Sequence, residues 1–175
     1  MSTRFRFALF LSCSIVLTGL GCSDSGSGPT IPATTLVLVS PVGGATNVAI
    51  DAPIVLTFSG PMGNGMDAYM DLHMGTTAAA IVPMTCSWSM DGTSVTCTHA
   101  ALAHGGSYTL HVGGGMRDAI GAPITMDNMM GQMGGQWLTS GMMGGMHAGQ
   151  PMNMMGAGWM GTNGNYGMIF PFTTS

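Results

Sequence analysis

Short apolar segments separated by glycine, proline, asparagine and aspartate run through residues 34–124. They predict strands at 36–39, 54–58, 67–74 and 107–112, a segment at 79–82 that leads into a hairpin, and a last strand at 168–173. Hydrophobic and polar positions alternate within 67–74 and 107–112, which is typical of strands with one buried face. No segment has ten residues of helical periodicity free of glycine. The pattern predicts an all-β sandwich.

A hairpin is predicted around Asp91-Gly92, because this dipeptide favours a tight turn between antiparallel strands. Pairing centred on the turn sets Cys86 opposite Cys97, with Trp88 packed over the pair in the core. In an oxidising compartment the two cysteines are expected to form a disulfide, and metal binding by the two thiols is the alternative. The bridge closes a loop of about 12 residues and should stabilise the domain by roughly 3 kcal/mol.

The N-terminal residues have the features of an export signal. Arg4 and Arg6 precede an apolar stretch at 7–20, which is too short and too interrupted for a transmembrane helix. Cys22 follows a glycine and precedes a segment rich in serine and glycine. This arrangement resembles a bacterial lipoprotein signal, although Gly19 stands where leucine is usual. A plain secretory peptide that is cut nearby is the alternative.

The lipoprotein resemblance implies three segments before the sandwich. Residues 1–21 would be the signal peptide, Cys22 would carry the lipid, and 22–33 would form a flexible tether. We therefore expect an exported protein that its lipid anchors in a membrane, at the outer membrane or cell surface rather than the inner membrane.

Charge excludes one class of partner. The chain has three Lys and Arg residues in total, and two of them, Arg4 and Arg6, leave with the signal. Arg117 then stands alone against seven aspartates, and a single cation cannot hold a phosphate backbone. We expect no binding to nucleic acid. The sequence also lacks a nucleophile elbow, an HExxH motif, a phosphate loop and a credible acid–base pair, so we expect no enzymatic activity.

Four segments resemble bacterial Ig-like domains of the SbsA type, in the same order as in that family. Residues 40–62 contain the Gly-Ala-Thr-Asn-Val stretch and the strand that ends in Phe-Ser-Gly-Pro-Met, and the other three segments are 102–110, 118–123 and 170–174. The resemblance implies an Ig-like β-sandwich, at 34–175, and a module that is usually not catalytic. Residues 126–164 have no counterpart in the family and look like an insertion before the last strand.

The opening also resembles, more weakly, the periplasmic copper carriers of the CopC type. These carriers share a similar sandwich and hold copper with methionine-rich segments. Their Cu(II) site uses an N-terminal histidine, which a lipidated Cys22 would rule out here. This resemblance therefore implies only that thioether side chains bind copper as Cu(I).

The inserted segment is rich in methionine and glycine. Residues 126–164 contain 11 of the 20 methionines and 11 glycines, with Asp127 as the one charged side chain. Glycine at this density favours neither helix nor strand, so we interpret the segment as a loop whose methionines have nothing to pack against. Thioethers prefer soft ions, and this predicts binding of Cu(I) or Ag(I).

The predicted metal ligands fall into three clusters of closely spaced side chains: Met129, Met130 and Met133; Met142, Met143, Met146 and His147; and Met152, Met154 and Met155. Three alternatives remain open for the same segment. It can be an adaptable surface for a protein partner, a sink for oxidants, or low-complexity sequence without a selected role.

Other methionines and histidines have plainer interpretations. Met70 and Met74 are predicted to lie in the core beside Leu72, whereas Met66 and His73 are freer to bind a ligand. The remaining three histidines of the sandwich are expected to be exposed polar residues, with the third pointing outward: His99, His104 and His111.

The sequence thus predicts a non-enzymatic envelope lipoprotein with an Ig-like domain that binds Cu(I) or Ag(I) through its methionine-rich loop. The alternative is a structural or adhesive Ig-like module whose loop contacts another envelope protein.

Overall fold

The computed structural model describes residues 32–139 and 159–175. All of them belong to one unit of the chain, 32–175. Its elements are β1 (Leu36–Ser40), β2 (Ile54–Phe58), η1 (Met66–Tyr69), β3 (Met70–Met74), β4 (Ile81–Val82), β5 (Met84–Trp88), β6 (Ser94–His99), β7 (Ser107–Val112), α1 (Met129–Gln132), β8 (Gln136–Trp137) and β9 (Met168–Thr173). Among these residues, no helix has the length and apolar character needed to cross a membrane.

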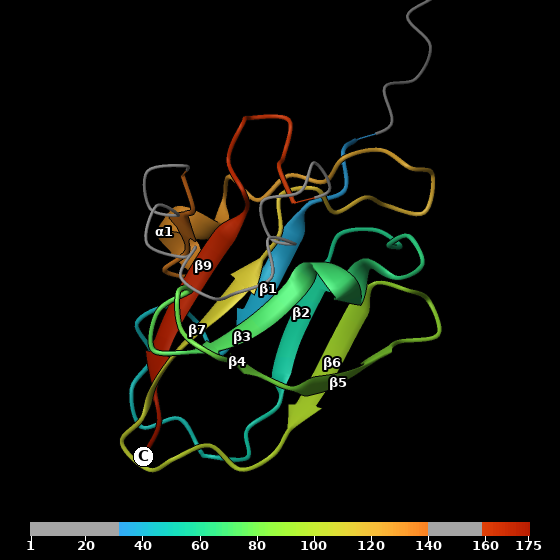
Figure 1. The fold of residues 1–175 in the computed structure, drawn as a ribbon. Coiled ribbons are helices and arrows are strands. Elements are labelled where there is room, and N and C mark those ends of the chain that lie inside the picture. Colours follow the sequence, from blue (N-terminus) through green and yellow to red (C-terminus); the bar gives the residue numbers. More distant parts are fainter. Residues whose placement is uncertain (1–31, 140–158) are drawn as a thin grey trace, which may run out of the picture. The chain divides into compact units, whose positions relative to one another are not determined.

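The strands form two antiparallel sheets. One has the order β1-β2-β6-β5 and the other the order β4-β3-β7-β9-β8. Figure 1 shows the two sheets, with β7 and β9 side by side although 55 residues separate Val112 from Met168 in the sequence. The predicted all-β, Ig-like sandwich is therefore confirmed.

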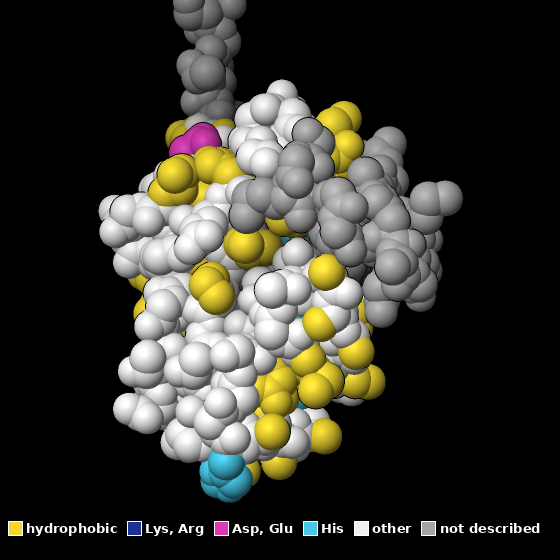
Figure 2. Space-filling view, turned by 60° about the vertical axis from the view of Figure 1, so that its left-hand side comes forward, with side chains coloured by type: hydrophobic (Ala, Val, Ile, Leu, Met, Phe, Trp, Pro, Cys, Tyr) yellow, Lys and Arg dark blue, Asp and Glu magenta, His cyan; other side chains and the backbone are white. Residues whose placement is uncertain are grey.

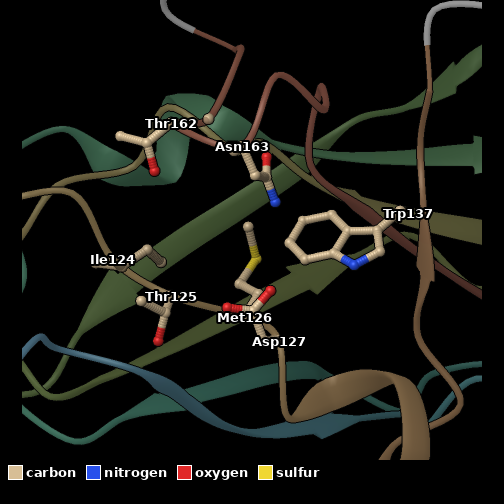
Figure 3. Close-up of a pocket in the computed structure, with 9 residues that line it drawn as sticks. Ile124, Thr125, Met126, Asp127, Trp137, Thr162 and Asn163 are labelled. Atoms are coloured by element: carbon tan, nitrogen blue, oxygen red, sulfur yellow. The ribbon is translucent and has the colours of Figure 1, made fainter.

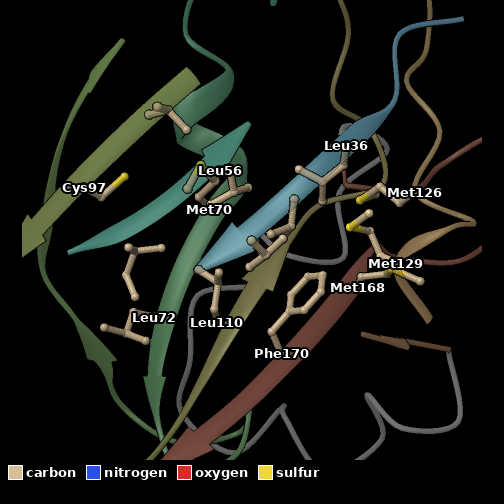
Figure 4. Packing of buried hydrophobic residues seen from close by; sticks show 14 of the residues in the cluster. Leu36, Leu56, Met70, Leu72, Cys97, Leu110, Met126, Met129, Met168 and Phe170 are labelled. Carbon is tan, nitrogen blue, oxygen red and sulfur yellow. The ribbon is translucent and has the colours of Figure 1, made fainter. Parts of the chain in front are cut away.

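The hydrophobic core lies between the sheets. Alternate residues of the central strands turn inward, and those of the second sheet include Leu72, Leu110 and Phe170, which have no exposed surface. Figure 4 shows these side chains converging with Leu56 of the first sheet. Each such side chain contributes about 1.5–3 kcal/mol of burial free energy, so this layer holds the two sheets together.

The predicted hairpin has the expected register. In the β5–β6 pair, Cys86 lies opposite Cys97 and Trp88 opposite Val95. Gly92 in the connecting turn has a φ of 68°, a conformation that glycine adopts without strain. Cys86 and Cys97 form a disulfide, which confirms the predicted bridge. Trp88 is half-buried and packs on Phe58, with ring centroids 5.9 Å apart.

The segment predicted as one strand at 67–74 is two elements. The one-turn helix η1 precedes β3, because Gly65 adopts a φ of 75° and turns the chain before Met66. Met70 and Leu72 are buried as predicted, but the prediction for Met74 is wrong, since 51% of its surface is exposed. Met74 is the last residue of β3 and adjoins the turn at Gly75.

The methionine-rich segment is partly built into the sandwich. Met126 and Met129 belong to the main core, and Figure 4 shows them beside Met168 at one end of it. The helical turn α1 and the short strand β8 make this packing possible. The expectation that these methionines have nothing to pack against is therefore wrong for Met126 and Met129.

Candidate functional site

The chain enters the stretch 140–158 from a fixed position on the second sheet. Gln136 and Trp137 of β8 pair with Ile169 and Met168 of β9. The next residue, Leu138, continues this contact: its amide donates to the carbonyl of Gly167 over 2.8 Å. The Leu138 carbonyl in turn accepts the amide of Tyr166 at 2.9 Å. The residues just before 140–158 thus extend the edge of the sheet.

The chain leaves the same stretch through Trp159, which is also fixed. Its indole stacks on the His111 ring at 4.8 Å and meets Tyr69 edge-on at 5.6 Å. Gly113 lies beneath the indole, where a Cβ would overlap the ring, so only glycine permits this approach. Trp159 and Leu138 share one small hydrophobic cluster with partly buried Tyr69, Tyr166 and Ile169.

The two ends of 140–158 are therefore held together on the outer face of the second sheet. The intervening 19 residues contain Met142, Met143, Met146, His147, Met152, Met154 and Met155, seven of the ten predicted metal ligands, and no charged side chain. These seven residues lie outside the described part of the chain, as does the predicted lipidation site Cys22.

The structure separates the three remaining predicted ligands. Met129 is a core residue with no exposed surface, and it packs in the apolar interior, where a cation would be costly, so we exclude it as a ligand. Its burial follows from α1, whose single turn contacts β1 and β8. Met133 is half-buried against the same core, and Met130 has 53% of its surface exposed. A further methionine outside the predicted set, Met160, is 45% exposed directly after Trp159.

Two histidines of the second sheet, His73 and His111, are buried. His73 and His111 have no exposed surface, so the expectation that His111 is an exposed polar residue is wrong. Both side chains lie on the outer face of the second sheet, where Trp159 covers His111. Their ring centroids are 6.5 Å apart.

Each of these imidazoles uses one nitrogen and leaves the other without a partner. His111 Nε2 lies 2.8 Å from the carbonyl oxygen of Tyr166, and His73 Nδ1 lies 3.3 Å from that of Ala79. His111 Nδ1 and His73 Nε2 are buried and have no hydrogen-bond partner among the described residues. Burial lowers the pKa of His111 to about 4, and it also lowers the pKa of His73, so both rings are neutral at pH 7.

An acidic side chain accompanies the histidine pair. Asp71 lies directly opposite His111 in the β3–β7 register, on the same face of the sheet. Burial raises the pKa of its carboxyl group, and the nearby His73 opposes that shift. The outer face of β3 and β7 therefore carries two neutral imidazoles and one partly buried carboxyl group.

The side chains of the other histidines and of Met66 make hydrogen bonds to the backbone of the sandwich. Exposed His104 places Nδ1 2.9 Å from the carbonyl of Ser175, and half-buried His99 contacts the carbonyls of Ala52 and Ala100. Met66, which the sequence left free, accepts the backbone amide of Arg117 at its sulfur, 3.1 Å away.

A small pocket opens beside the base of the methionine-rich stretch. Figure 3 shows the sulfur of Met126, the Trp137 indole and the Asn163 amide lining it, with Asp127 at its rim. Its volume is about 60 Å³, which suits ordered water rather than an organic ligand. In the described residues, no three His, Cys, Asp or Glu side chains come together to hold a metal ion.

The surface carries little charge. Arg117 is the one Lys or Arg in the ranges 32–139 and 159–175, and its guanidinium donates to the carbonyl of Gly121. On the face drawn in Figure 2, no Lys or Arg is visible and hydrophobic side chains are interspersed with uncharged surface.

Three solved structures illustrate what the fold is similar to. The surface-layer protein SbsC, domains 1–6, is 18% identical with a TM-score of 0.39, and the match covers 53% of this chain and 12% of SbsC. CopC from Methylosinus trichosporium OB3b is 20% identical with a TM-score of 0.41, covering 52% of this chain and 84% of CopC. Native alpha-2-macroglobulin from Escherichia coli, spanning domains MG0-NIE-MG1, is 18% identical with a TM-score of 0.40, covering 54% of this chain and 29% of that one.

These likenesses concern the sandwich alone, and the chain spans only about an eighth of SbsC. None of the curated proteins matches the chain. The model of the bacterial Ig-like domain family, in contrast, matches residues 30–130, which is more than half of the sequence. The chain belongs to the family of bacterial Ig-like domains, as the resemblance of residues 40–62 predicted.

Proposed function

We propose that this protein is a non-enzymatic envelope lipoprotein whose Ig-like sandwich presents a methionine-rich loop that binds Cu(I) or Ag(I). The proposed ligands are the predicted ones without buried Met129: Met130, Met133, Met142, Met143, Met146, His147, Met152, Met154 and Met155. The observation that supports this function best is the anchoring of Leu138 and Trp159 in one cluster, which closes the stretch 140–158 into a loop.

Holding these two residues together would favour binding of one ion by several sulfur atoms. Packing of Leu138 and Trp159 fixes the residues that flank 140–158, which would reduce the entropy lost when several of the six thioethers of that stretch bind one ion. Two to four of them suit the low coordination number of a soft monovalent ion. Methionine also needs no deprotonation, so binding should persist at mildly acid pH.

The location of the protein is part of the same proposal. Cys22, at the end of the apolar N-terminal stretch, would carry the lipid, and the disulfide between Cys86 and Cys97 is of the kind that persists outside the cytosol. A thioether loop at the envelope would sequester or hand over soft metal before it enters the cell.

The test is a competitive Cu(I) titration of the mature protein under anaerobic conditions. In a first variant, leucine replaces each of the six methionines of the loop, which removes the sulfur atoms but keeps side-chain volume and chain length. We expect the natural protein to bind more than one Cu(I) and the variant to lose the ions held by the loop.

A matched control carries leucine at exposed Met74 and Met90, outside the loop. It should take up as much Cu(I) as the natural protein. Equal Cu(I) uptake by the natural protein and the six-leucine variant would defeat the proposal, and the structural or adhesive module would then be the better account of the loop.

A further inference from the structure

The pair of buried histidines beneath Trp159 has an unusual hydrogen-bonding pattern. In each ring, the partnered nitrogen faces a backbone carbonyl oxygen, that of Tyr166 for His111 and that of Ala79 for His73. A carbonyl can only accept, so the partnered nitrogen must carry the hydrogen. In a neutral ring, the other nitrogen then holds an unshared lone pair, at His111 Nδ1 and His73 Nε2.

A buried lone pair without a donor is costly. Burying a polar atom without a partner loses its hydrogen bonds to water, and here this cost arises at two atoms on neighbouring strands of one sheet. A backbone carbonyl that fixes one imidazole nitrogen and thereby directs the lone pair of the other is the arrangement that metal-binding histidines commonly have. The pattern points to a missing electron-pair acceptor.

The spacing of the rings fits a shared ion. A metal–imidazole bond is about 2.0–2.1 Å long, so two imidazoles on one ion have nitrogens about 4 Å apart and ring centroids about 6 Å apart. The centroids of His73 and His111 are 6.5 Å apart. The two residues occupy diagonal positions on neighbouring strands, since His111 pairs with Asp71 and His73 with Thr109.

We propose that His73 and His111 form a two-coordinate site for Cu(I) or Ag(I), held by His73 Nε2 and His111 Nδ1 on the outer face of the sheet. Two neutral nitrogen donors suit a soft monovalent ion of low coordination number. Zn(II) prefers four ligands, and no third His, Cys, Asp or Glu joins the pair among the described residues. The site is separate from the thioether loop and does not depend on its function.

Asp71 supplies the charge that such an ion requires. A cation between two neutral rings in a buried position needs an anion nearby. The Asp71 carboxyl lies on the same face, opposite His111, and interacts electrostatically with His73. Trp159, stacked on His111, would shield the ion from water and from oxidation.

The experiment uses Ag(I), which does not change oxidation state, and the variant with six loop leucines, so that loop sulfur does not compete. The mature protein is labelled with ¹⁵N in histidine, and the nitrogen chemical shifts are followed during the titration. We expect one equivalent of Ag(I) to move the signals of His73 Nε2 and His111 Nδ1 and to leave those of exposed His104 in place.

Two substitutions complete the test. His73→Gln and His111→Gln should each weaken binding of this ion by roughly tenfold or more, whereas His104→Gln should leave its affinity unchanged. The shift measurement needs no substitution of the pair, so it decides the matter even if a glutamine variant fails to fold. If the nitrogens of His73 and His111 keep their shifts at one equivalent of Ag(I), the site does not exist, whatever the loop binds.

Discussion

Acidification from pH 7 to pH 4 is expected to destabilise the metal-free protein by roughly 3 kcal/mol through His111 alone. In the unfolded chain this histidine has an ordinary pKa of about 6.5, whereas burial lowers its pKa to about 4 in the fold. Below pH 6.5 the unfolded state therefore takes up a proton that the folded state does not. The part of the free energy of unfolding that depends on neutral His111 is fully present above pH 6.5 and is lost as the pH falls toward 4.

His73 and Asp71 modify this dependence in opposite directions. The pKa of His73 is also lowered by burial, so this histidine adds to the loss in acid. The pKa of Asp71 is raised by burial, so its folded carboxyl takes up a proton earlier and offsets part of the loss. Urea unfolding at a series of pH values, with a chelator present, measures the combined effect of His111, His73 and Asp71 on the free energy of unfolding.

Substitution of His111 separates its contribution to the pH dependence of stability from those of the other groups. His111→Phe keeps an aromatic ring beneath Trp159 but cannot be protonated, so the free energy of unfolding should fall much less between pH 6.5 and 4. Exposed His104→Phe is the matched control and should keep the natural pH dependence. An unchanged slope in His111→Phe would show that the buried histidine is not the source of acid sensitivity.

Gly167→Ala is expected to cost about 3 kcal/mol or more and to loosen the methionine-rich loop. Gly167 has a φ of 111°, and a Cβ there would overlap the carbonyl oxygen of Val112 and the backbone of Gly113. Alanine would push the start of β9 away from β7. It would also disturb the hydrogen bond from the Leu138 amide to the Gly167 carbonyl, which holds one end of the loop.

Gly164→Ala is the control for this substitution. Gly164 also has a positive φ, of 79°, but a Cβ there would meet no atom within 4 Å. It should therefore show only the backbone strain, about 1–2 kcal/mol. Denaturant unfolding gives both free energies, and limited proteolysis between Leu138 and Trp159 reports on the loop. Equal stability of the two variants would contradict the close approach at Gly167.

The strand pattern and the hairpin could be predicted because their determinants are local. The Asp91-Gly92 turn fixes the register of β5 and β6, and that register alone brings Cys86 and Cys97 together. The alternation of Tyr108, Leu110 and Val112 likewise identifies the core face of β7. The local sequence contains all of this information.

The burial of His111 could not be predicted in the same way, because distant residues cause it. The alternation within β7 places His111 on the face away from the main core, and such a face is often exposed to water. Trp159 and Tyr166, which follow the methionine-rich stretch, cover and contact it in the folded protein. The tertiary structure thus overrides a correct prediction of the strand and its faces.

Met129 illustrates a second limit of prediction from the sequence. Glycine-rich sequence around it argues against regular structure, yet one helical turn is enough to bury its side chain with Met126 and Met168. Gly135, where a Cβ would overlap Phe170 and Met168, permits the chain to approach the core closely. Glycine therefore permits packing in this segment, whereas composition suggested that it prevents packing.

The most direct test of soft-metal binding is X-ray absorption at the copper edge of the mature protein loaded with Cu(I). Thioether ligands from the anchored loop would give a nearest-neighbour shell made mainly of sulfur. A buried histidine pair would add a minority of nitrogen neighbours. A spectrum dominated by sulfur is the result that the account predicts, and a shell made of nitrogen and oxygen alone would contradict it.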